Sequence, residues 1–403
     1  MNVLFLTREY PPNVYGGAGV HVEYLAKEVA ELANVEVRCF GEHDFEASSL
    51  RAKGYPFGRE SFQALEKPLR GALDTLEANL ATLADPVTSD VVHCHTWYAQ
   101  FGGILAKQLY GIPLVVTTHS LEPLRPWKRE QLGRGYDLSS WIEKTAIEMA
   151  DAVIAVSDET RADILNLFSV DPGRVTVIHN GIDIDEYRPT KEASALERHG
   201  VDPNSPYVLF VGRITRQKGI IHLVNAIRFI REDAPIVLCA GAPDTPEIAQ
   251  EMKAAVAEVR AQGRDNVIWI QEMLSKPEVI QMYSHAAVFC CPSIYEPFGI
   301  INLEAMACQT AVVASAVGGI KEVVVDGETG ILVPVKQLPV APFEPEDPET
   351  FSRDLAAGIN QLLVDPELRN SMADRGQKRA RELFSWKSIA KKTVALYESL
   401  VNS

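Results

Sequence analysis

Short runs of apolar residues alternate with amphipathic stretches along this chain of 403 residues. In the first part of the chain, the apolar runs predict strands at residues 3–6, 35–40, 91–93, 114–117, 153–156 and 175–178. Most stretches between them show the i, i+3, i+4 spacing of helices. Strands that alternate with helices in this way predict an open parallel sheet in an α/β fold.

A charged segment that contains prolines interrupts this pattern between residues 183 and 206. A second series of apolar runs follows, at residues 208–211, 236–240, 267–270, 288–291, 312–314 and 331–333. Helical patterns begin near Gly219, Pro246, Lys276 and Gly299. We therefore predict two Rossmann-like α/β domains facing each other across a cleft, an N-terminal domain at residues 1–185 and a C-terminal domain at 206–385, with a hinge at 186–205.

Composition narrows the range of functions. The net charge of −15 opposes binding to nucleic-acid phosphates and anionic lipid, so neither partner is expected. No apolar run approaches the roughly 20 residues that a membrane span needs. The first residues, MNVLFLTREYPP, lack the basic start of a signal peptide and predict a buried strand. The six cysteines mostly lie in apolar runs without a C-x-x-C pair, which indicates core thiols and a cytoplasmic location.

A glycine-rich stretch, Gly16-Gly17-Ala18-Gly19, follows the first predicted strand and precedes a helical pattern. Glycines at the start of a helix let backbone N–H groups approach an anion, which the helix dipole also favours. A tight turn between strand and helix is an equally good interpretation. The spacing G-G-x-G differs from the G-x-G-x-x-G of nicotinamide-binding folds, so a dinucleotide cofactor is not favoured.

Two motifs suggest metal binding at first sight, but neither has a suitable context. In residues 93–95, HCH, the alternation of a strand places the two histidines on one face and the cysteine on the other. A polar cluster at the end of a strand explains this motif better. Residues 183–185, DID, lie in the predicted hinge, where turn formation is the better explanation. We therefore expect no metal site.

Candidate binding residues lie where predicted strands end. His119 follows the fourth strand and has two interpretations, a hydrogen bond to a sugar hydroxyl or a cap on the next turn. Arg213 and Lys218 follow the first strand of the second series, just before a helix. Cations are not placed beside a helix N-terminus for stability, so this pair predicts a diphosphate site more readily than a solvated basic loop.

Two carboxylates and a glycine pair follow later strands of the second series. Glu296 precedes a predicted helix and Glu304 lies inside it, so the two side chains can hold different parts of one extended ligand. Pro297 and Gly299 open that helix, and its free N–H groups are a further candidate contact. A capped amphipathic helix with an incidental acidic pair is the alternative. Residues 318–319, GG, form another glycine turn before a helix, which by itself is a weak phosphate or ribose signal.

Four motifs occur in order along the chain: GGAG, G-R-x-x-x-x-K-G, E-P-F-G-x-x-x-x-E and the later GG. With these motifs, the chain resembles the retaining glycosyltransferases of the GT-B fold over nearly its whole length. The chain is most similar to short actinobacterial ADP-glucose-dependent glycogen synthases, a group also described as α-maltose-1-phosphate synthases. The resemblance implies a retaining hexosyltransferase that moves glucose from ADP-glucose, its nucleotide-sugar co-substrate, to glucose 1-phosphate or to α-glucan ends in glycogen synthesis. It implies no separate cofactor, and a helix at 386–403 that crosses back onto the first domain.

The resemblance also implies roles for individual residues. Arg213 and Lys218 would stabilise the donor diphosphate as it leaves, Glu296 would hold the donor glucose, and His119 would lie near its C6 hydroxyl and the reacting centre. The remaining donor contacts implied are Gly16, Gly17, Phe298, Gly299, Ile300, Glu304, Gly318 and Gly319, with Glu304 at the ribose.

The chain departs from larger bacterial glycogen synthases at one motif. Their Lys-Thr-Gly-Gly matches residues 14–17, which read VYGG here, so the lysine contact to donor phosphate is missing. A basic cluster after His119 predicts a phosphorylated acceptor, although a solvated basic face explains it as well. The cluster consists of Arg125, Lys128, Arg129 and Arg134. Alternatives are a UDP- or GDP-sugar donor with another acceptor, a sugar-nucleotide epimerase, and a non-catalytic binding protein. The base preference and any homo-oligomer stay open.

Overall fold

The computed structural model describes residues 1–14, 16–58 and 62–402. The chain divides into two compact units, Met1–Gly181 with Trp386–Ser403, and Ile182–Ser385. The segment 186–205, which the sequence suggested to be a hinge, therefore belongs to the second unit. Its helix α7 (Ser194–Arg198) buries Ala195 and Leu196, and the Ala195 N–H donates to Gln281 Oε1 at 2.8 Å. Burial of these apolar side chains explains why the segment packs as part of that unit.

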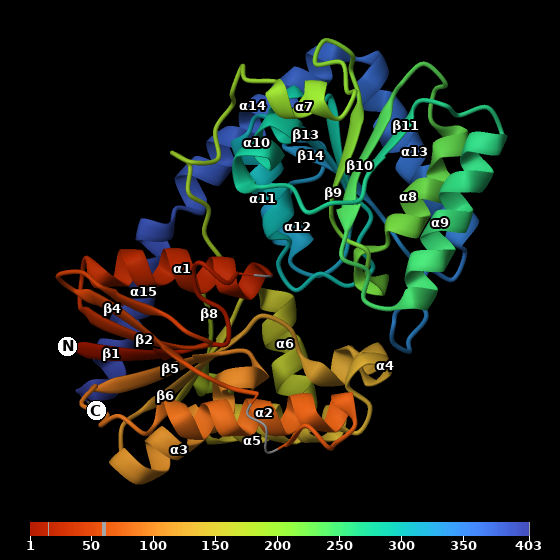
Figure 1. Ribbon diagram of the computed structural model, residues 1–403. Helices are drawn as coiled ribbons and strands as arrows, with labels where there is room; N and C mark the ends of the chain where they lie inside the picture. Colours follow the sequence, from red (N-terminus) through yellow and green to blue (C-terminus); the bar gives the residue numbers. More distant parts are fainter. Residues whose placement is uncertain (15, 59–61, 403) are drawn as a thin grey trace. The chain divides into compact units, whose positions relative to one another are not determined.

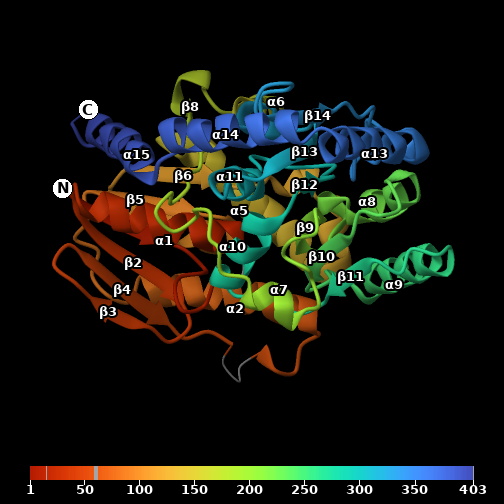
Figure 2. The same ribbon diagram turned by 90° about the horizontal axis from the view of Figure 1, so that it is seen from above.

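The first unit contains one sheet with the strand order β3-β4-β2-β1-β5-β6-β7-β8. Its strands are β1 (Asn2–Leu6), β2 (Asn34–Phe40), β3 (Asp44–Glu46), β4 (Leu50–Tyr55), β5 (Val91–His95), β6 (Leu114–Thr118), β7 (Ala152–Ala155) and β8 (Val175–Val177). All pairings are parallel except that of β3 with β4, which lie at one edge of the sheet (Figure 2). The hydrophobic pattern predicted neither of these two strands, because the edge strand β3 has three exposed residues and β4 has no continuous apolar run.

Helices cover both faces of this sheet, as in other doubly wound folds. They are α1 (Gly17–Ala30), α2 (Lys67–Thr82), α3 (Trp97–Tyr110), α4 (Arg129–Leu132), α5 (Gly135–Met149), α6 (Asp158–Leu167) and α15 (Trp386–Val401). Helices α1 and α15 pack side by side on one face, and α2, α3 and α5 lie on the other (Figure 1). The C-terminal helix therefore completes the core of the first unit.

The second unit contains an all-parallel sheet with the order β11-β10-β9-β12-β13-β14. Its strands are β9 (Val208–Arg213), β10 (Ile236–Gly241), β11 (Val267–Ile270), β12 (Val288–Cys291), β13 (Ala311–Ser315) and β14 (Gly330–Val333). Each overlaps a strand that the apolar runs predicted. The order reverses between β9 and β12, and in open α/β sheets ligands bind at the carboxyl ends of strands beside such a reversal.

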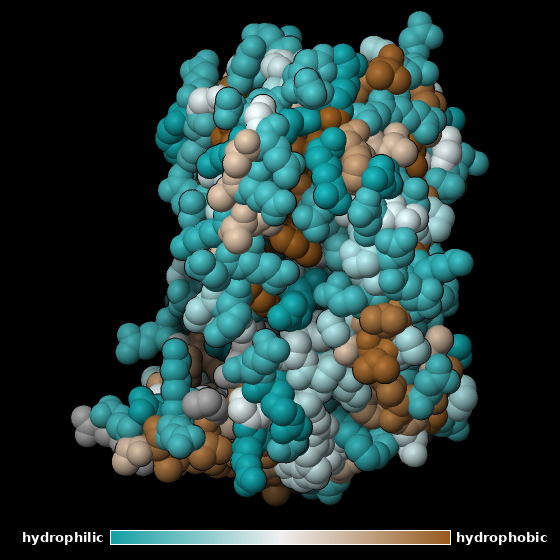
Figure 3. Space-filling model, turned by 90° about the vertical axis from the view of Figure 1, so that its right-hand side faces the viewer, coloured by the Kyte–Doolittle hydropathy of each residue, from teal (hydrophilic) through white to brown (hydrophobic). Residues whose placement is uncertain are grey.

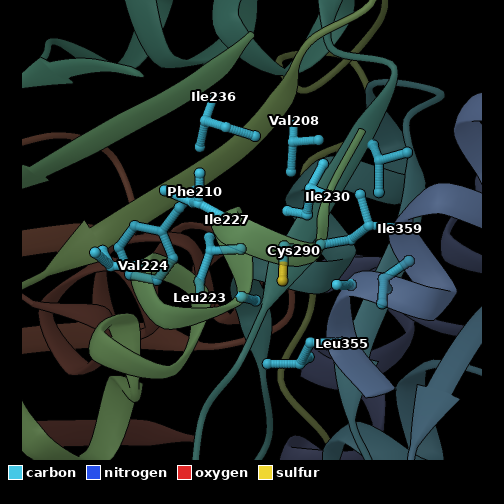
Figure 4. Packing of buried hydrophobic residues seen from close by; sticks show 14 of the residues in the cluster. Val208, Phe210, Leu223, Val224, Ile227, Ile230, Ile236, Cys290, Leu355 and Ile359 are labelled. Carbon is cyan, nitrogen blue, oxygen red and sulfur yellow. The ribbon is translucent and has the colours of Figure 1, made fainter. Parts of the chain in front are cut away.

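The core of the second unit forms where α8 (Ile220–Ala226) and α13 (Pro348–Val364) pack on one face of this sheet (Figure 4). Phe210, Leu223, Val224, Leu355 and Ile359 are fully buried there. Besides α7, α8 and α13, the unit contains α9 (Pro246–Ala261), α10 (Lys276–His285), α11 (Ile300–Ala307), α12 (Ile320–Val323) and α14 (Pro366–Leu383). This packing makes a rigid base for the loops at the strand ends.

Two observations concern the buried thiols and the outer surface. All six cysteines are buried and free, as the sequence predicted for core thiols. The face in Figure 3 is largely hydrophilic, with hydrophobic side chains in separate patches. Among the described residues, the helices are too short or too polar to span a bilayer.

Candidate active site

Lys218 and Glu296 form an ion pair in the second unit. Lys218 ends a short 3-10 helix (Arg216–Lys218) after β9, and Glu296 lies in the loop after β12. The Lys218 Nζ is 2.6 Å from Glu296 Oε2, and the side chains are only 18% and 10% exposed. Gly219 has φ +58°, and a Cβ there would lie 2.1 Å from the Pro292 carbonyl oxygen. This glycine therefore allows the two loops to approach each other.

The charge of Lys218 is maintained by its surroundings. Burial by itself would lower the pKa of this ammonium group, because a charged group loses hydration. The charge and hydrogen bond of Glu296, together with the charges of other nearby groups such as Glu304, outweigh that effect, so the pKa of Lys218 lies above its ordinary value. Lys218 therefore stays protonated at neutral pH in a site that excludes most water.

Arg213 is oriented by an acidic residue on the neighbouring strand's loop. Strands β9 and β10 are adjacent and parallel, so the end of one lies next to the end of the other. The Arg213 Nη2 donates a hydrogen bond to Asp244 Oδ1. The Asp244 side chain is 7% exposed, so this contact fixes the guanidinium at the carboxyl edge of the sheet.

The loop that carries Glu296 is packed against two glycines. A Cβ on Gly318, which has φ +53°, would lie 1.8 Å from the Glu296 carbonyl oxygen, and a Cβ on Gly319 would lie 2.5 Å from that of Pro297. The Gly319 N–H also donates to the Glu296 carbonyl oxygen at 3.0 Å. These glycines therefore have a supporting function that the sequence did not indicate, since they position the backbone of Glu296.

The residues that open α11 occupy a sterically restricted turn. Gly299, with φ +95°, precedes the helix, and a Cβ there would lie 2.8 Å from Asn302 Nδ2. Phe298 is buried and its ring lies 6.0 Å from that of Phe384, centroid to centroid. Packing thus holds the turn at residues 298–300, and backbone N–H groups at the start of a helix are suited to an anion or hydroxyl.

Two tyrosines hold Glu304. Tyr187 donates its hydroxyl to Glu304 Oε1 at 3.2 Å, and Tyr283 donates to Oε2 at 3.1 Å. Burial raises the pKa of Glu304 to about 7, although both hydrogen bonds work in the opposite direction. This carboxyl group therefore titrates near neutral pH, and as a carboxylate it can accept hydrogen bonds from ligand hydroxyl groups.

The glycine-rich stretch of the first unit is oriented by Glu9. The Gly16 N–H donates to Glu9 Oε2 at 2.9 Å. A Cβ on Gly19 would lie 2.7 Å from the same oxygen, so this glycine is required for packing. A Cβ on Gly17 would have no described atom within 4 Å, which leaves room for a ligand. Tyr15, the residue before this stretch, lies outside the described residues.

His119 belongs to a cluster of imidazoles in the first unit. Its Nε2 is 3.2 Å from His95 Nδ1, and its ring centroid is 4.6 Å from that of His21. Burial lowers the pKa values of His95 and His119 well below the ordinary range, and that of His21 to about 4. All three rings are therefore neutral at pH 7.

The basic cluster after His119 is less uniform than the sequence suggested. Lys128 forms a buried ion pair with Glu122 at 2.9 Å, and Arg129 pairs with Asp137 at 2.6 Å on the surface. Arg125 donates from Nη1 to Ser120 Oγ at 2.8 Å, and Arg134 is exposed. The burial of Lys128 lowers its pKa, despite its carboxylate partner. Two of the four cations therefore have structural partners already.

The two histidines of residues 93–95, predicted to form a polar cluster at the end of a strand, make different contacts. His93 bonds to Tyr397 and Thr117, while His95 lies with His21 and His119. The turn predicted at residues 183–185 is confirmed, since Asp183 Oδ1 accepts from the Asp185 N–H at 2.9 Å. The sequence did not indicate five residues that support the site, namely Asp244, Tyr187, Tyr283, Glu9 and His21. Only Asp244 had a recognisable signal, an acidic side chain just beyond the strand next to Arg213.

Family comparisons match both halves of the chain. The profile described as Glycosyltransferase Family 4 matches residues 15–186, and the one described as Glycosyl transferases group 1 matches residues 192–341. The second match includes the Lys218–Glu296 pair and the tyrosine-bound Glu304. Together the two matches cover most of the chain.

Individual proteins resemble the chain along its full length. It is 48% identical to the alpha-maltose-1-phosphate synthase of Mycolicibacterium smegmatis, over 99% of this chain and 100% of that one. The enzyme of the same name from Mycobacterium tuberculosis is also 48% identical, with the same coverage. Among solved structures, sucrose-phosphate synthase from Thermosynechococcus elongatus matches with a TM-score of 0.80 and 25% identity, over 99% of both chains. These neighbours assign the two α/β units to the GT-B fold.

Proposed function

The chain belongs to the family 4/group 1 glycosyltransferases, and from this premise we propose that it is a retaining glucosyltransferase that moves glucose from ADP-glucose to glucose 1-phosphate. Its product would be α-maltose 1-phosphate. The ion pair of Lys218 and Glu296 at the carboxyl edge of the second sheet carries the proposal, because a protonated amine beside a carboxylate suits a ligand that has both phosphate and hydroxyl groups. The full-length similarity to alpha-maltose-1-phosphate synthases supports the choice of product, and the choice of ADP-glucose as donor rests on the resemblance of the sequence motifs.

The proposed reaction exchanges one bond at the anomeric carbon for another. The bond from C1 of the donor glucose to the β-phosphate oxygen breaks, and a bond from C1 to the acceptor O4 forms with the α configuration retained. ADP leaves with the electron pair, and the acceptor hydroxyl proton is transferred to a leaving phosphate oxygen. Charge that develops on the diphosphate is stabilised by Arg213 and Lys218, whose orientation by Asp244 and Glu296 precedes the reaction.

Other residues of the second unit bind the donor in this proposal. Glu296 accepts hydrogen bonds from the glucose hydroxyls, and Glu304 accepts them from the ribose. The turn at residues 298–300 supplies backbone N–H groups to the sugar, while residues 318–319 support the loop of Glu296. Because two fixed cations supply the positive charge, the reaction needs no divalent metal.

Acceptor recognition is proposed for a smaller set of cations than the sequence suggested. Arg125 and Arg134 are the candidates for the acceptor phosphate, because Lys128 and Arg129 already pair with carboxylates. Arg125→Gln should raise KM for glucose 1-phosphate about tenfold, the value of one lost charge-assisted hydrogen bond. Arg129→Gln serves as the matched control and should leave that KM within about twofold. An equal rise in both variants would contradict this assignment.

The first experiment is product analysis by phosphorus and proton NMR. The full chain is incubated with ADP-glucose, and with UDP-glucose or GDP-glucose in parallel, together with glucose 1-phosphate or glycogen. A new α-linked disaccharide phosphate supports the proposal. Transfer to glycogen alone supports a polymer-extending synthase instead, and conversion of the nucleotide sugar without acceptor supports an epimerase. Consumption of UDP- or GDP-glucose alone overturns the choice of donor.

A further inference from the structure

Three imidazoles from separate elements of the first unit meet in one place. His21 lies on α1, His95 ends β5, and His119 follows β6. One ring nitrogen from each lies within 4.8 Å of the others. His21 and His95 are buried, and His119 is partly exposed. The cluster is therefore open on the side of His119 and closed on the others.

One pair of these rings already has the nitrogen spacing of tetrahedral metal coordination. Two imidazole nitrogens bound to the same Zn²⁺ at 2.0–2.1 Å are about 3.3 Å apart. The distance from His95 Nδ1 to His119 Nε2 is 3.2 Å. His21 has its ring centroid 4.6 Å from that of His119 and 5.3 Å from that of His95. The ligand nitrogens of all three rings lie within 4.8 Å of one another, so binding of one ion requires the more distant ones to approach to about 3.3 Å.

The contact between His21 and Asn180 determines which nitrogen of His21 is available. Asn180 Oδ1 lies 2.8 Å from His21 Nδ1, so Nδ1 carries the proton and donates it. The lone pair is then on Nε2, which is buried and has no hydrogen-bond partner among the described residues. Histidine ligands of metals typically donate their other N–H to an oxygen in this way. An orphaned buried nitrogen is costly, and a bound cation would satisfy it.

The protonation state of the cluster also suits a metal. Burial keeps the three rings neutral at pH 7, so a cation binds without net loss of a proton; the proton shared by His95 Nδ1 and His119 Nε2 only has to move to the other nitrogen of its ring. The rings of Phe5 and Trp386 enclose His95 and His21, with centroids 5.4 Å and 5.1 Å away. Neutral nitrogen ligands in such surroundings favour Zn²⁺ and related transition metals over Mg²⁺ or Ca²⁺, which prefer oxygen.

We propose that His21, His95 and His119 form a three-nitrogen site for a divalent transition metal, with Zn²⁺ as the reference ion and a fourth position open. The consequence for activity rests on the proposed function and on the family resemblance, which implies that His119 lies near the donor glucose. An ion bound to His119 takes its nitrogen away from the sugar. Zn²⁺ at this site therefore inhibits glucosyl transfer, and the transfer itself requires no metal.

Metal binding is tested on the full chain without any sugar. The protein is treated with a chelator, dialysed and titrated with Co²⁺, whose visible absorption is strong in tetrahedral sites. We expect one equivalent to bind with intense bands, and one equivalent of Zn²⁺ to remove them. His21→Gln and His119→Gln should each weaken Co²⁺ binding at least tenfold. His43→Gln is the matched control from the same unit, outside the cluster, and should bind as the wild type does.

Several outcomes would overturn the inference. They are the absence of saturable Co²⁺ binding to the wild type, equal binding in His119→Gln and His43→Gln, and displacement of Co²⁺ by Mg²⁺ as readily as by Zn²⁺. Circular dichroism checks the fold of each variant. His119 is the less buried position, so its variant keeps the test decisive if His21→Gln does not fold.

Activity is measured separately. With ADP-glucose and glucose 1-phosphate, one equivalent of Zn²⁺ should lower the wild-type rate at least tenfold and that of His21→Gln less than twofold, each relative to its own metal-free rate. Equal inhibition of both would overturn the regulatory part. If Co²⁺ binds as expected but no sugar is transferred with any donor, the metal site stands and the proposed function alone fails.

Discussion

Replacing Lys218 by methionine tests the central ion pair of the second unit. The substitution removes the ammonium group and keeps an unbranched side chain of similar length. Glu296 would then retain a mostly buried carboxylate without the partner that now lies 2.6 Å away. Loss of one member of a buried pair costs 3–5 kcal/mol. Because both side chains keep some exposure, we expect a loss of about 3 kcal/mol in the free energy of unfolding, the lower end of that range.

The effect on catalysis should be separate from the effect on stability. In the proposed mechanism Lys218 stabilises charge that develops on the leaving diphosphate, and loss of one such group in other enzymes costs about 100- to 1000-fold in kcat, or about 2.7–4 kcal/mol. We therefore expect kcat for ADP-glucose to fall at least 100-fold in Lys218→Met. Steady-state rates of ADP release measure kcat, and urea denaturation measures stability.

A double variant separates these two effects. In Lys218→Met combined with Glu296→Gln, no buried charge of the pair remains, so most of the lost stability should return while the rate stays low. Lys378→Met is the control, because Lys378 is 73% exposed and lies 3.9 Å from Glu382. A folded Lys218→Met protein with kcat within tenfold of the wild type would refute the role of this cation.

Three further predictions concern pH, the glycine pair and metals. Burial raises the pKa of Glu304 to about 7, so the carboxylate that we propose as the acceptor of ribose hydrogen bonds is lost as the pH falls through 7. KM for the donor should rise between pH 7.5 and 5.5, and Glu304→Gln should have a high KM at every pH; a wild-type KM independent of pH would contradict this. Gly318→Ala would place a Cβ 1.8 Å from the Glu296 carbonyl oxygen, so kcat/KM should fall at least tenfold. The control is Gly263→Ala, which should lose stability only, because Gly263 has φ +91° and open space around it. Saturating EDTA should leave the transfer rate unchanged, and loss of activity that magnesium or manganese restores would show that the two cations are not sufficient.

Much of the fold follows from local pattern. The apolar runs at 208–211 and 288–291 are buried on both faces of the sheet, as parallel strands are, so hydrophobicity alone located them. The edge strand β3 carries three exposed residues, and only its pairing with β4 makes it a strand. The segment 186–205 is polar in sequence, yet Ala195 and Leu196 are buried by contacts that no local pattern reveals.

The site shows the same division between sequence and tertiary structure. The sequence by itself determined that Arg213, Lys218 and Glu296 lie at carboxyl ends of parallel strands, because the strand pattern and the motifs are local. Only the tertiary structure decided which side chain each one contacts, since Asp244 and Glu296 reach their partners from 31 and 78 residues away in the chain. The same holds for His21, His95 and His119, which come together because adjacent parallel strands bring their carboxyl ends to one edge and α1 packs across it. Separation along the sequence does not indicate such contacts, because the packing of whole helices and strands determines them.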